Sequence, residues 1–215
     1  MSPSRLPPPS ATELTDGPSP AARSATAAVT ILDIEASGFG AGGYPIEIGY
    51  VRDDGCSWCS LIRPEPEWTR WDASAQQVHG ITRVQVESQG RPAREIAQRL
   101  NTDLAGRTAY SDAWAHDYAW LAQLFDAAGL APRFRLESIH RLIDADQLPA
   151  LADHRRSAFD TLQVRRHRAS SDARALQWAL LQVQQQAGTD PESRPSAATA
   201  ERPTRDGPGD PTAGG

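Results

Sequence analysis

The chain contains no lysine, and all 22 of its positively charged side chains are arginines. Such a composition follows from codon bias as readily as from phosphate recognition by guanidinium groups, and we take codon bias as its cause. Acids outnumber arginines, which gives a formal net charge of −5. This excess excludes proteins that hold nucleic acid by bulk electrostatic attraction, so any phosphate-binding surface must be local.

Cysteine is also scarce, since Cys56 and Cys59 are the two in the sequence. A Cys-x-x-Cys pair suggests zinc or redox chemistry, but no second pair and no histidine at zinc-ligand spacing follows. We therefore interpret the pair as two buried or half-buried thiols on opposite faces of a strand. A zinc or redox protein built on this pair is kept as a rival interpretation.

No apolar run is long enough for a membrane span or for the core of a signal peptide. We therefore expect a cytoplasmic protein with no membrane partner. Residues 1–27 are rich in Pro, Ala and Ser, and residues 188–215 are rich in Pro and Gly without an apolar period, so both segments are expected to be disordered. Residues 28–187 remain as one domain. A structural subunit whose Pro-rich tails carry the function is a second rival.

Hydrophobic periodicity predicts one mixed sheet flanked by helices, an α/β layer architecture. The expected strands are 28–35, 45–52, 56–63 and 108–111, and the expected helices are 92–104, 114–128 and 170–186. The first three strands are joined by short turns and should form an antiparallel meander.

The clearest chemical signal is a pair of acids at the end of an apolar strand. A strand's period of two places the side chains of Asp33 and Glu35 on one face. Crowded carboxylates repel each other unless a divalent cation neutralises them, so we interpret the pair as half of a metal site. The glycine-rich loop 36–43 lets backbone amides approach a phosphate or sugar, although alone it is a weak signal.

Three further residues become candidates for the same site when they are considered together with this pair. Asp117 and Asp172 each lie in the first turns of an expected helix, where interaction with the helix macrodipole alone explains an aspartate. His167 lies five positions before Asp172, where a neutral imidazole can take a proton from a water molecule. Residues 155–168 hold five arginines and one acid. This run is either a solvated face or a phosphate-binding surface, and both interpretations remain open.

These residues resemble the motifs of the DEDDh exonucleases, the family that contains ribonuclease T and bacterial polymerase proofreading subunits. Residues 33–38, Asp-Ile-Glu-Ala-Ser-Gly, are similar to the first motif, and residues 110–121, which include Asp117, are similar to the second. Residues 167–172, His-x-x-x-x-Asp, resemble the third. Residues 78–82, Val-His-Gly-Ile-Thr, resemble a segment common between the first two. The matches occur in family order across the domain.

Two positions depart from the family pattern. Ala36 stands where the first motif usually has threonine, and Asp112 replaces a frequent asparagine at a different spacing from Asp117. Substrate contacts near these positions are therefore open. His116 directly precedes Asp117 and is the alternative base, but we favour His167.

The resemblance implies a ribonuclease H-like fold in which Asp33, Glu35, Asp117 and Asp172 hold two Mg²⁺ or Mn²⁺ ions and His167 deprotonates the attacking water. It implies a 3′-to-5′ exonuclease that hydrolyses the terminal phosphodiester bonds of single-stranded nucleic acid and releases nucleoside 5′-monophosphates. The alternative is a catalytically weak or inactive module of the same fold that binds nucleic acid or a partner. Retention of the four acids and the histidine argues against it.

The implied partner is the 3′ end of single-stranded DNA or RNA, which enters beside Ser37 and Gly38. Trp114, Phe39 and Tyr44 are candidates for stacking on terminal bases, although core packing is the commoner fate of such rings. The sequence does not separate DNA from RNA, or proofreading from repair, RNA trimming or oligonucleotide recycling. Family members are often dimers, so a homodimer is compatible with the resemblance.

Overall fold

The computed structural model describes residues 28–40 and 42–189. The segments expected to be disordered lie outside these residues, apart from Gly188 and Thr189, which end the last helix. Their expected disorder stays a prediction. Within the described residues, no helix is both long and apolar enough to cross a membrane.

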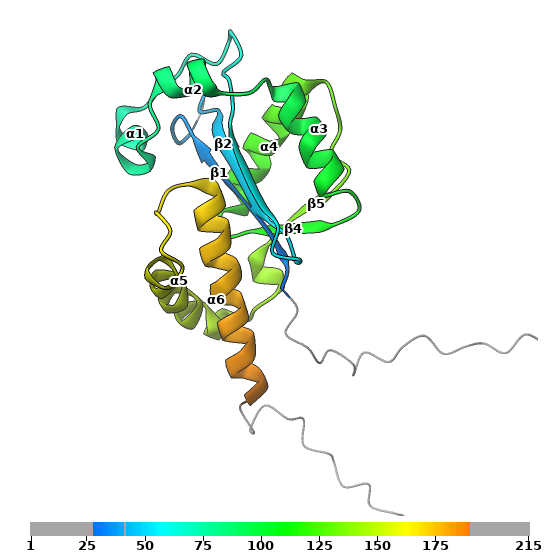
Figure 1. Ribbon diagram of the computed structural model, residues 1–215, viewed down its shortest axis with the longest axis vertical. Coiled ribbons are helices and arrows are strands. Elements are labelled where there is room, and N and C mark those ends of the chain that lie inside the picture. The colour runs from blue at the N-terminus through cyan, green and yellow to red at the C-terminus, as the bar shows by residue number, and fades with distance from the viewer. Residues whose placement is uncertain (1–27, 41, 190–215) are drawn as a thin grey trace, which may run out of the picture.

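One mixed sheet of five strands, in the order β3-β2-β1-β4-β5, forms the centre of the fold (Figure 1). The strands are β1 (Thr30–Ala36), β2 (Pro45–Val51), β3 (Ser57–Leu61), β4 (Thr108–Ser111) and β5 (Arg135–Ser138). The first three form the predicted antiparallel meander, whereas β4 and β5 run parallel to β1. The antiparallel and parallel parts of the sheet therefore meet at β1, so segments from both parts surround its end.

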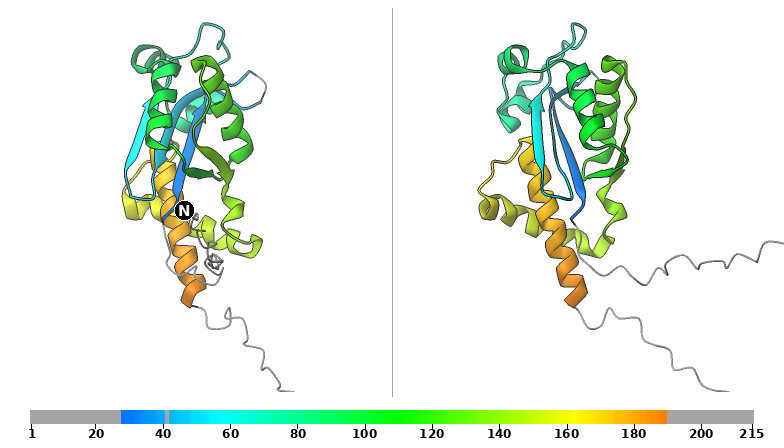
Figure 2. Two further views of the ribbon diagram at one scale, coloured as in Figure 1. Left: turned by 90° about the vertical axis from the view of Figure 1, so that its right-hand side faces the viewer. Right: turned by 45° about the vertical axis from the view of Figure 1, so that its right-hand side comes forward.

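Helices cover both faces of this sheet. They are α1 (Ala73–His79), α2 (Arg83–Gln89), α3 (Ala93–Asp103), α4 (Trp114–Ala128), α5 (Leu148–Leu162) and α6 (Ala169–Thr189), with 3₁₀ turns at Ile139–Arg141 and Ala145–Gln147. Figure 2 shows α3 and α4 on one side of the sheet and α6 on the other. α5 packs beside α6, and α1 and α2 lie near the end of β1 (Figure 1).

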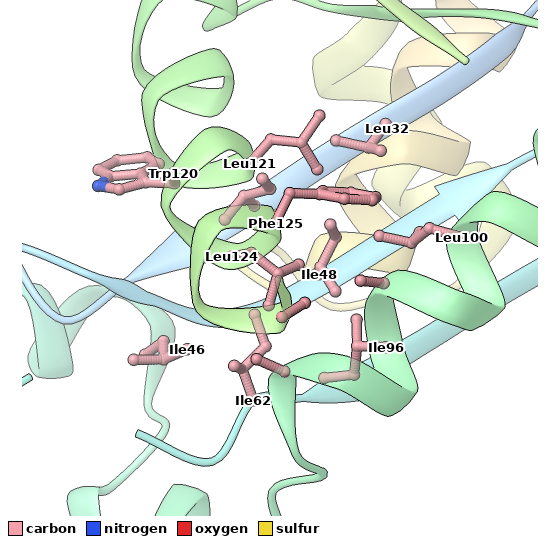
Figure 3. Close-up of a cluster of buried hydrophobic side chains, with 14 of the residues drawn as sticks. Leu32, Ile46, Ile48, Ile62, Ile96, Leu100, Trp120, Leu121, Leu124 and Phe125 are labelled. Carbon is pink, nitrogen blue, oxygen red and sulfur yellow. The ribbon is translucent and has the colours of Figure 1, made fainter. Parts of the chain in front are cut away.

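The main core lies between the sheet and the helices α3 and α4 (Figure 3). Leu32 and Ile48 from the strands meet Leu100, Leu124 and Phe125 from the helices, and all five are at most 2% exposed. These are residues of the apolar helix stripes that the sequence predicts. A second core lies between the opposite face of the sheet and α6. Because both faces are covered, β2 is buried at all seven positions.

The predicted fold class is confirmed, and the sequence analysis missed four elements. Helices α1 and α2 have seven residues each and few buried side chains, so they give no readable apolar stripe. Strand β5 has only four residues, which are too few to show a clear alternation of apolar and polar side chains. Helix α5 has a proline in its first turn and three buried residues among many charges, which hid its periodicity.

The interpretation of Cys56 and Cys59 as buried or half-buried thiols is wrong, because both are exposed. Cys59 lies on the edge strand β3, and Cys56 precedes that strand, so neither side chain has a covering layer. Neither cysteine belongs to a group of metal-ligating side chains among the described residues. The zinc rival therefore gains no support from their surroundings.

Candidate functional site

The end of β1 presents two carboxylates to a cavity of about 560 Å³. Asp33 and Glu35 lie on one face of the strand, as the period of two requires, and both line this cavity. Neither carboxylate has a hydrogen bond or an ion pair within the described part of the chain. Both side chains are partly exposed, so their oxygens are free to accept an external partner.

Asp117 enters the same cavity from the first turn of α4. Its side chain is buried, and it accepts a hydrogen bond from the hydroxyl of Ser111 on β4. Because β4 runs parallel to β1 and leads directly into α4, the start of this helix lies beside the end of β1. Asp112, in the turn between β4 and α4, lines the cavity as well.

Asp172 reaches the cavity from the first turn of α6. The backbone N–H of Arg168 donates to its carboxylate at 2.9 Å, which fixes the side chain at the helix start. The start of α6 can lie close to β2 because residue 49 is a glycine. A Cβ at Gly49 would lie 2.4 Å from the backbone nitrogen of Ser170. The first turn of α6 therefore packs directly on the backbone of β2.

An ion pair between the buried Glu47 and the partly exposed Arg168 holds the loop that leads into α6. The guanidinium of Arg168 donates to Glu47 on β2, at 2.6 Å from Nη2 and 3.1 Å from Nε, and the backbone N–H of Ala169 donates to Glu47 at 2.9 Å. Glu47 is 1% exposed. A planar guanidinium that contacts both carboxylate oxygens fixes direction as well as distance. This pair therefore sets the path of the chain through His167, the residue immediately before Arg168.

His167 lies at the edge of the cavity in an uncommon backbone conformation. Its φ of 58° is in the left-handed region, which few residues other than glycine adopt. The side chain is exposed and lines the cavity. His116, the alternative base, lines the same cavity and stacks on Trp120 at 5.6 Å between ring centroids. The structure brings both histidines to the site, so the preference for His167 stays a prediction.

The acids form two overlapping groups. Oxygen atoms of Asp33, Glu35 and Asp172 lie within 4.8 Å of one another, and so do oxygen atoms of Asp33, Asp112 and Asp117. Asp33 belongs to both groups. Carboxylate oxygens at this spacing fit hard divalent cations such as Mg²⁺ and Mn²⁺. The four predicted acids thus converge on one place, and Asp112 joins them.

These carboxylates strongly disfavour one another's ionised forms. Burial raises the pKa of Asp33 well above its usual range, and the neighbouring carboxylates, Asp117 first, raise it further. Burial and the nearby carboxylate of Asp172 raise the pKa of Glu35 to about 7. Burial also raises the pKa of Asp117 to about 7. A bound divalent cation would reverse these shifts, because it favours the ionised form of every acid around it.

The three aromatic residues proposed for base stacking have different surroundings. Phe39 is 64% exposed and lines the cavity, where its ring lies 6.1 Å from that of His116. Tyr44 is fully buried and stacks on Trp68, so its proposed contact with a base is wrong. Trp114 donates its indole N–H to the carbonyl of Leu136 and does not line this cavity. Phe39 is therefore the candidate that remains.

The two residues proposed to lie beside the substrate also differ. Gly38 lines the cavity, and a side chain there would collide with Asp72, since a Cβ would lie 2.8 Å from the Cβ of that residue. Ser37 is fully buried, and its hydroxyl accepts the backbone N–H of Tyr44 at 3.1 Å. Its own N–H donates to the carbonyl of Tyr44 at 2.9 Å. The side chain of Ser37 thus shapes the loop, and substrate contact by Ser37 and Gly38 stays a prediction.

His79 contributes a buried donor to the cavity wall. Its Nδ1 accepts the N–H of Ile81 at 3.0 Å, and its Nε2 is buried with no partner among the described residues. Burial lowers the pKa of the imidazole, which favours the neutral form. Because Nδ1 is an acceptor, the proton of the neutral ring is on Nε2.

Most arginines of the run 155–168 have partners inside the protein. Arg168 binds Glu47, Arg155 binds Asp112 and Asp172, and Arg156 binds Asp153. Arg166 lies over the ring of Phe159 at 4.5 Å. Arg155 and Arg168 are therefore internal contacts beside the cavity, whereas Arg156, Arg165 and Arg166 are exposed.

Sequence reasoning missed the residues that support this site: Glu47, Gly49, Asp112 as a member of the acid cluster, and Arg155. For Glu47 a signal existed, because it is the only charged residue in the strand Pro45–Val51. A lone acid in such a strand requires a buried partner. Arg155 carried no distinguishing signal among its neighbouring arginines.

No protein-family model and no curated protein matches this chain. Similar solved structures include exonuclease I from Methylocaldum szegediense, at 14% identity and a TM-score of 0.53, which covers 74% of this chain and 40% of that one. E. coli exonuclease I in complex with a dA16 oligonucleotide matches at 11% identity and a TM-score of 0.54, over 76% of this chain and 41% of that one. The complex with dT13 matches at 13% identity and a TM-score of 0.51, over 75% and 41%.

This chain thus spans about four tenths of the length of those exonuclease I chains. At 11–14% identity, the likeness concerns the arrangement of strands and helices and not the individual residues. The described domain therefore shares its arrangement of strands and helices with part of these exonuclease I structures.

Proposed function

We propose that this protein is a metal-dependent 3′-to-5′ exonuclease that hydrolyses the terminal phosphodiester bond of single-stranded nucleic acid and releases nucleoside 5′-monophosphates. One observation carries the proposal: two groups of three carboxylates share Asp33 at the edge of a single cavity. The fold supports it, because similar solved structures include two exonuclease I proteins.

Asp33, Glu35 and Asp172 would hold one Mg²⁺ or Mn²⁺ ion, and Asp33, Asp117 and Asp112 the other. Two such ions stabilise both the attacking and the leaving oxygen of an in-line displacement at phosphorus. Groups of the protein orient two of these carboxylates before ions bind. Ser111 orients Asp117, and the backbone N–H of Arg168 orients Asp172, so neither carboxylate has to be ordered when ions bind.

His167 is the proposed general base and accepts a proton from the attacking water. Its exposed imidazole can meet a water molecule and then release the proton to solvent. The pair of Glu47 and Arg168 fixes the backbone on the C-terminal side of His167, so the imidazole is held near Asp172. His116 is the competing base and differs in being stacked on Trp120, with Phe39 in an edge-on contact.

The proposed substrate is the 3′ end of a DNA or RNA strand. E. coli exonuclease I has been crystallised with dA16 and dT13 oligonucleotides, which makes single-stranded DNA the first substrate to test. The exposed ring of Phe39 offers a terminal base a stacking surface that tolerates any sequence.

A degradation assay tests this function. The full chain is incubated with 5′-labelled single-stranded and 3′-tailed duplex DNA and RNA in Mg²⁺ or Mn²⁺, and the released mononucleotides are identified by chromatography. We expect stepwise shortening from the 3′ end by the wild type and a loss of several orders of magnitude in Asp33→Asn. Asp126→Asn, which removes an exposed acid from the distal part of α4, should leave the rate unchanged.

Hydrolysis that persists in excess chelator, or that survives Asp33→Asn, would contradict the proposal. Tight binding of single strands without any cleavage in either metal would instead favour a non-cutting module of the same fold. The ratio of rates on matched DNA and RNA strands would assign the substrate class.

A further inference from the structure

Arg155 occupies an unusual position between the two groups of acids. It lies on α5, and its guanidinium forms one ion pair with Asp112 and a second with Asp172, the latter at 3.4 Å. Asp112 belongs to one group of three carboxylates and Asp172 to the other. A single guanidinium therefore contacts one member of each proposed ion site.

The other cations near the cavity are directed elsewhere. The guanidinium of Arg168 binds Glu47, that of Arg156 binds Asp153 on the surface, and that of Arg166 lies over Phe159. Among the described residues, Arg155 is the arginine whose guanidinium pairs with the cavity acids. Five carboxylates converge there, from Asp33, Glu35, Asp112, Asp117 and Asp172, so one positive charge offsets only part of their repulsion.

We propose that Arg155 is a built-in counter-ion that competes with divalent cations for the cavity and thereby sets their affinity. The inference rests on the proposed function, because it assumes that the acids hold metal ions. When ions bind, oxygens of Asp112 and Asp172 would contact metal, and the guanidinium would lose its two ion pairs. A nearby divalent charge then repels the guanidinium as well. Both effects weaken cation binding in the wild type.

This proposal differs from a purely structural role for the same contacts. If Arg155 only tied α5 to the start of α6, its removal would lower stability equally with and without metal. A counter-ion predicts a different pattern. Its removal should destabilise the metal-free protein, because the acids lose their cation, while the metal-loaded protein should be affected much less.

The chain offers a close control in the neighbouring residue. Arg156 lies on the same helix, carries the same charge and also lines the cavity, but its partner Asp153 is exposed. Replacing either arginine with glutamine changes the net charge of the protein equally. Any difference between Arg155→Gln and Arg156→Gln therefore reports the contacts with the cavity acids and not bulk charge.

The test measures Mn²⁺ and Mg²⁺ binding to the full chain by isothermal titration calorimetry, and melting temperature in chelator and in excess Mn²⁺. We expect Arg155→Gln to bind Mn²⁺ about tenfold more tightly than wild type, and Arg156→Gln to bind within about twofold. Melting in chelator should fall most for Arg155→Gln, and Mn²⁺ should recover it. Arg155→Lys keeps the charge but cannot contact two acids with a planar guanidinium, so it should bind Mn²⁺ with an intermediate affinity. It replaces the glutamine variant in this test if that variant does not fold.

Equal or weaker Mn²⁺ binding by Arg155→Gln and Arg155→Lys, with binding intact in the wild type, would overturn this inference and leave the metal sites standing. Mn²⁺ binding by Arg155→Gln but not by the wild type would also support the inference, because it would mean that Arg155 excludes the ion completely. Absence of binding in all variants would overturn both the inference and the proposed metal sites. Asp33→Asn identifies the sites, because it should abolish the heat of binding that Arg155→Gln enhances.

Discussion

Glu35 and Glu47 are paired directly across β1 and β2, yet their carboxylates have opposite surroundings. Directly paired residues of antiparallel strands project from the same face of the sheet. Glu47 receives the guanidinium of Arg168 and the N–H of Ala169, whereas Glu35 has no partner within the described part of the chain. The same sheet face thus satisfies one acid fully and leaves its neighbour unpaired. This contrast fits the proposed role of Glu35 as a cation ligand, because its carboxylate is free to accept an external partner.

The largest effect on stability should come from breaking the satisfied pair. Arg168→Gln leaves Glu47 buried without its counter-charge, and we expect a loss of about 3–4 kcal/mol in the free energy of unfolding. Urea denaturation measures this loss. Arg83→Gln removes an arginine from the exposed pair with Glu87 and should change stability by about 0.5 kcal/mol or less. If both variants lost the same free energy of unfolding, Arg168 would not be needed to stabilise the buried carboxylate of Glu47.

The next effect concerns the cavity acids Glu35 and Asp117, whose raised pKa values reverse the usual dependence of stability on pH. In the metal-free folded state the pKa values of Glu35 and Asp117 are raised to about 7. The folded state therefore holds protons that the unfolded chain has already released above about pH 5. By linkage, the stability of the metal-free protein should fall as pH rises from about 5 to about 8, by on the order of 2 kcal/mol.

Melting curves in chelator at several pH values measure this fall. The same series in excess Mn²⁺ is the control, because bound cations keep the acids ionised and should remove the decline. His79, whose pKa is lowered by burial, acts in the opposite direction in both series. A metal-free stability that rises steadily with pH would show that the acids are not coupled by burial and repulsion.

A smaller effect of opposite sign should follow from removing one unpaired acid. Asp33→Asn eliminates the carboxylate whose ionisation is opposed by burial and by four neighbouring carboxylates. We expect the metal-free protein to gain about 1 kcal/mol of stability at pH 8, while stabilisation by Mn²⁺ disappears. Calorimetric melting with and without Mn²⁺ measures both. A clear loss of stability in chelator would mean that Asp33 has a structural partner.

The smallest effect on stability should come from His167. Its side chain is exposed, so His167→Ala should change the free energy of unfolding by about 0.5 kcal/mol or less. Cleavage should slow by a factor of about 10²–10⁴ while Mn²⁺ binding stays measurable. His116→Ala is the matched variant, and a larger loss of rate there would reassign the base. Complete loss of Mn²⁺ binding in His167→Ala would make His167 a metal ligand.

The sequence predicted the elements whose residues repeat with a clear period. Strands β1 and β2 and the helices α3, α4 and α6 carry apolar positions at regular spacing, and each covers a core. The acids could be found because their types and spacing, Asp33-x-Glu35 in particular, carry chemistry that does not depend on tertiary detail. The convergence of these acids with Asp172 then followed from the family resemblance and not from the residues alone.

The supporting residues could not be predicted in the same way. Arg155 owes its role to the angle at which α5 packs beside α6, and nothing in its immediate neighbours distinguishes it from Arg156. Tyr44 lies in a glycine-rich loop that suggests exposure, yet the loop folds back so that Gly43 approaches the carbonyl of Gly38, where a Cβ would lie 2.0 Å away. The ring is thereby directed into the core, which local sequence does not reveal.

The close contact between Gly49 and Ser170 has a consequence for the order of events during synthesis. The ribosome makes Asp33, Asp112 and Asp117 long before it makes Asp172, and the first turn of α6 can settle only against a finished β2. A growing chain therefore holds an incomplete set of acids until its final helix emerges and docks.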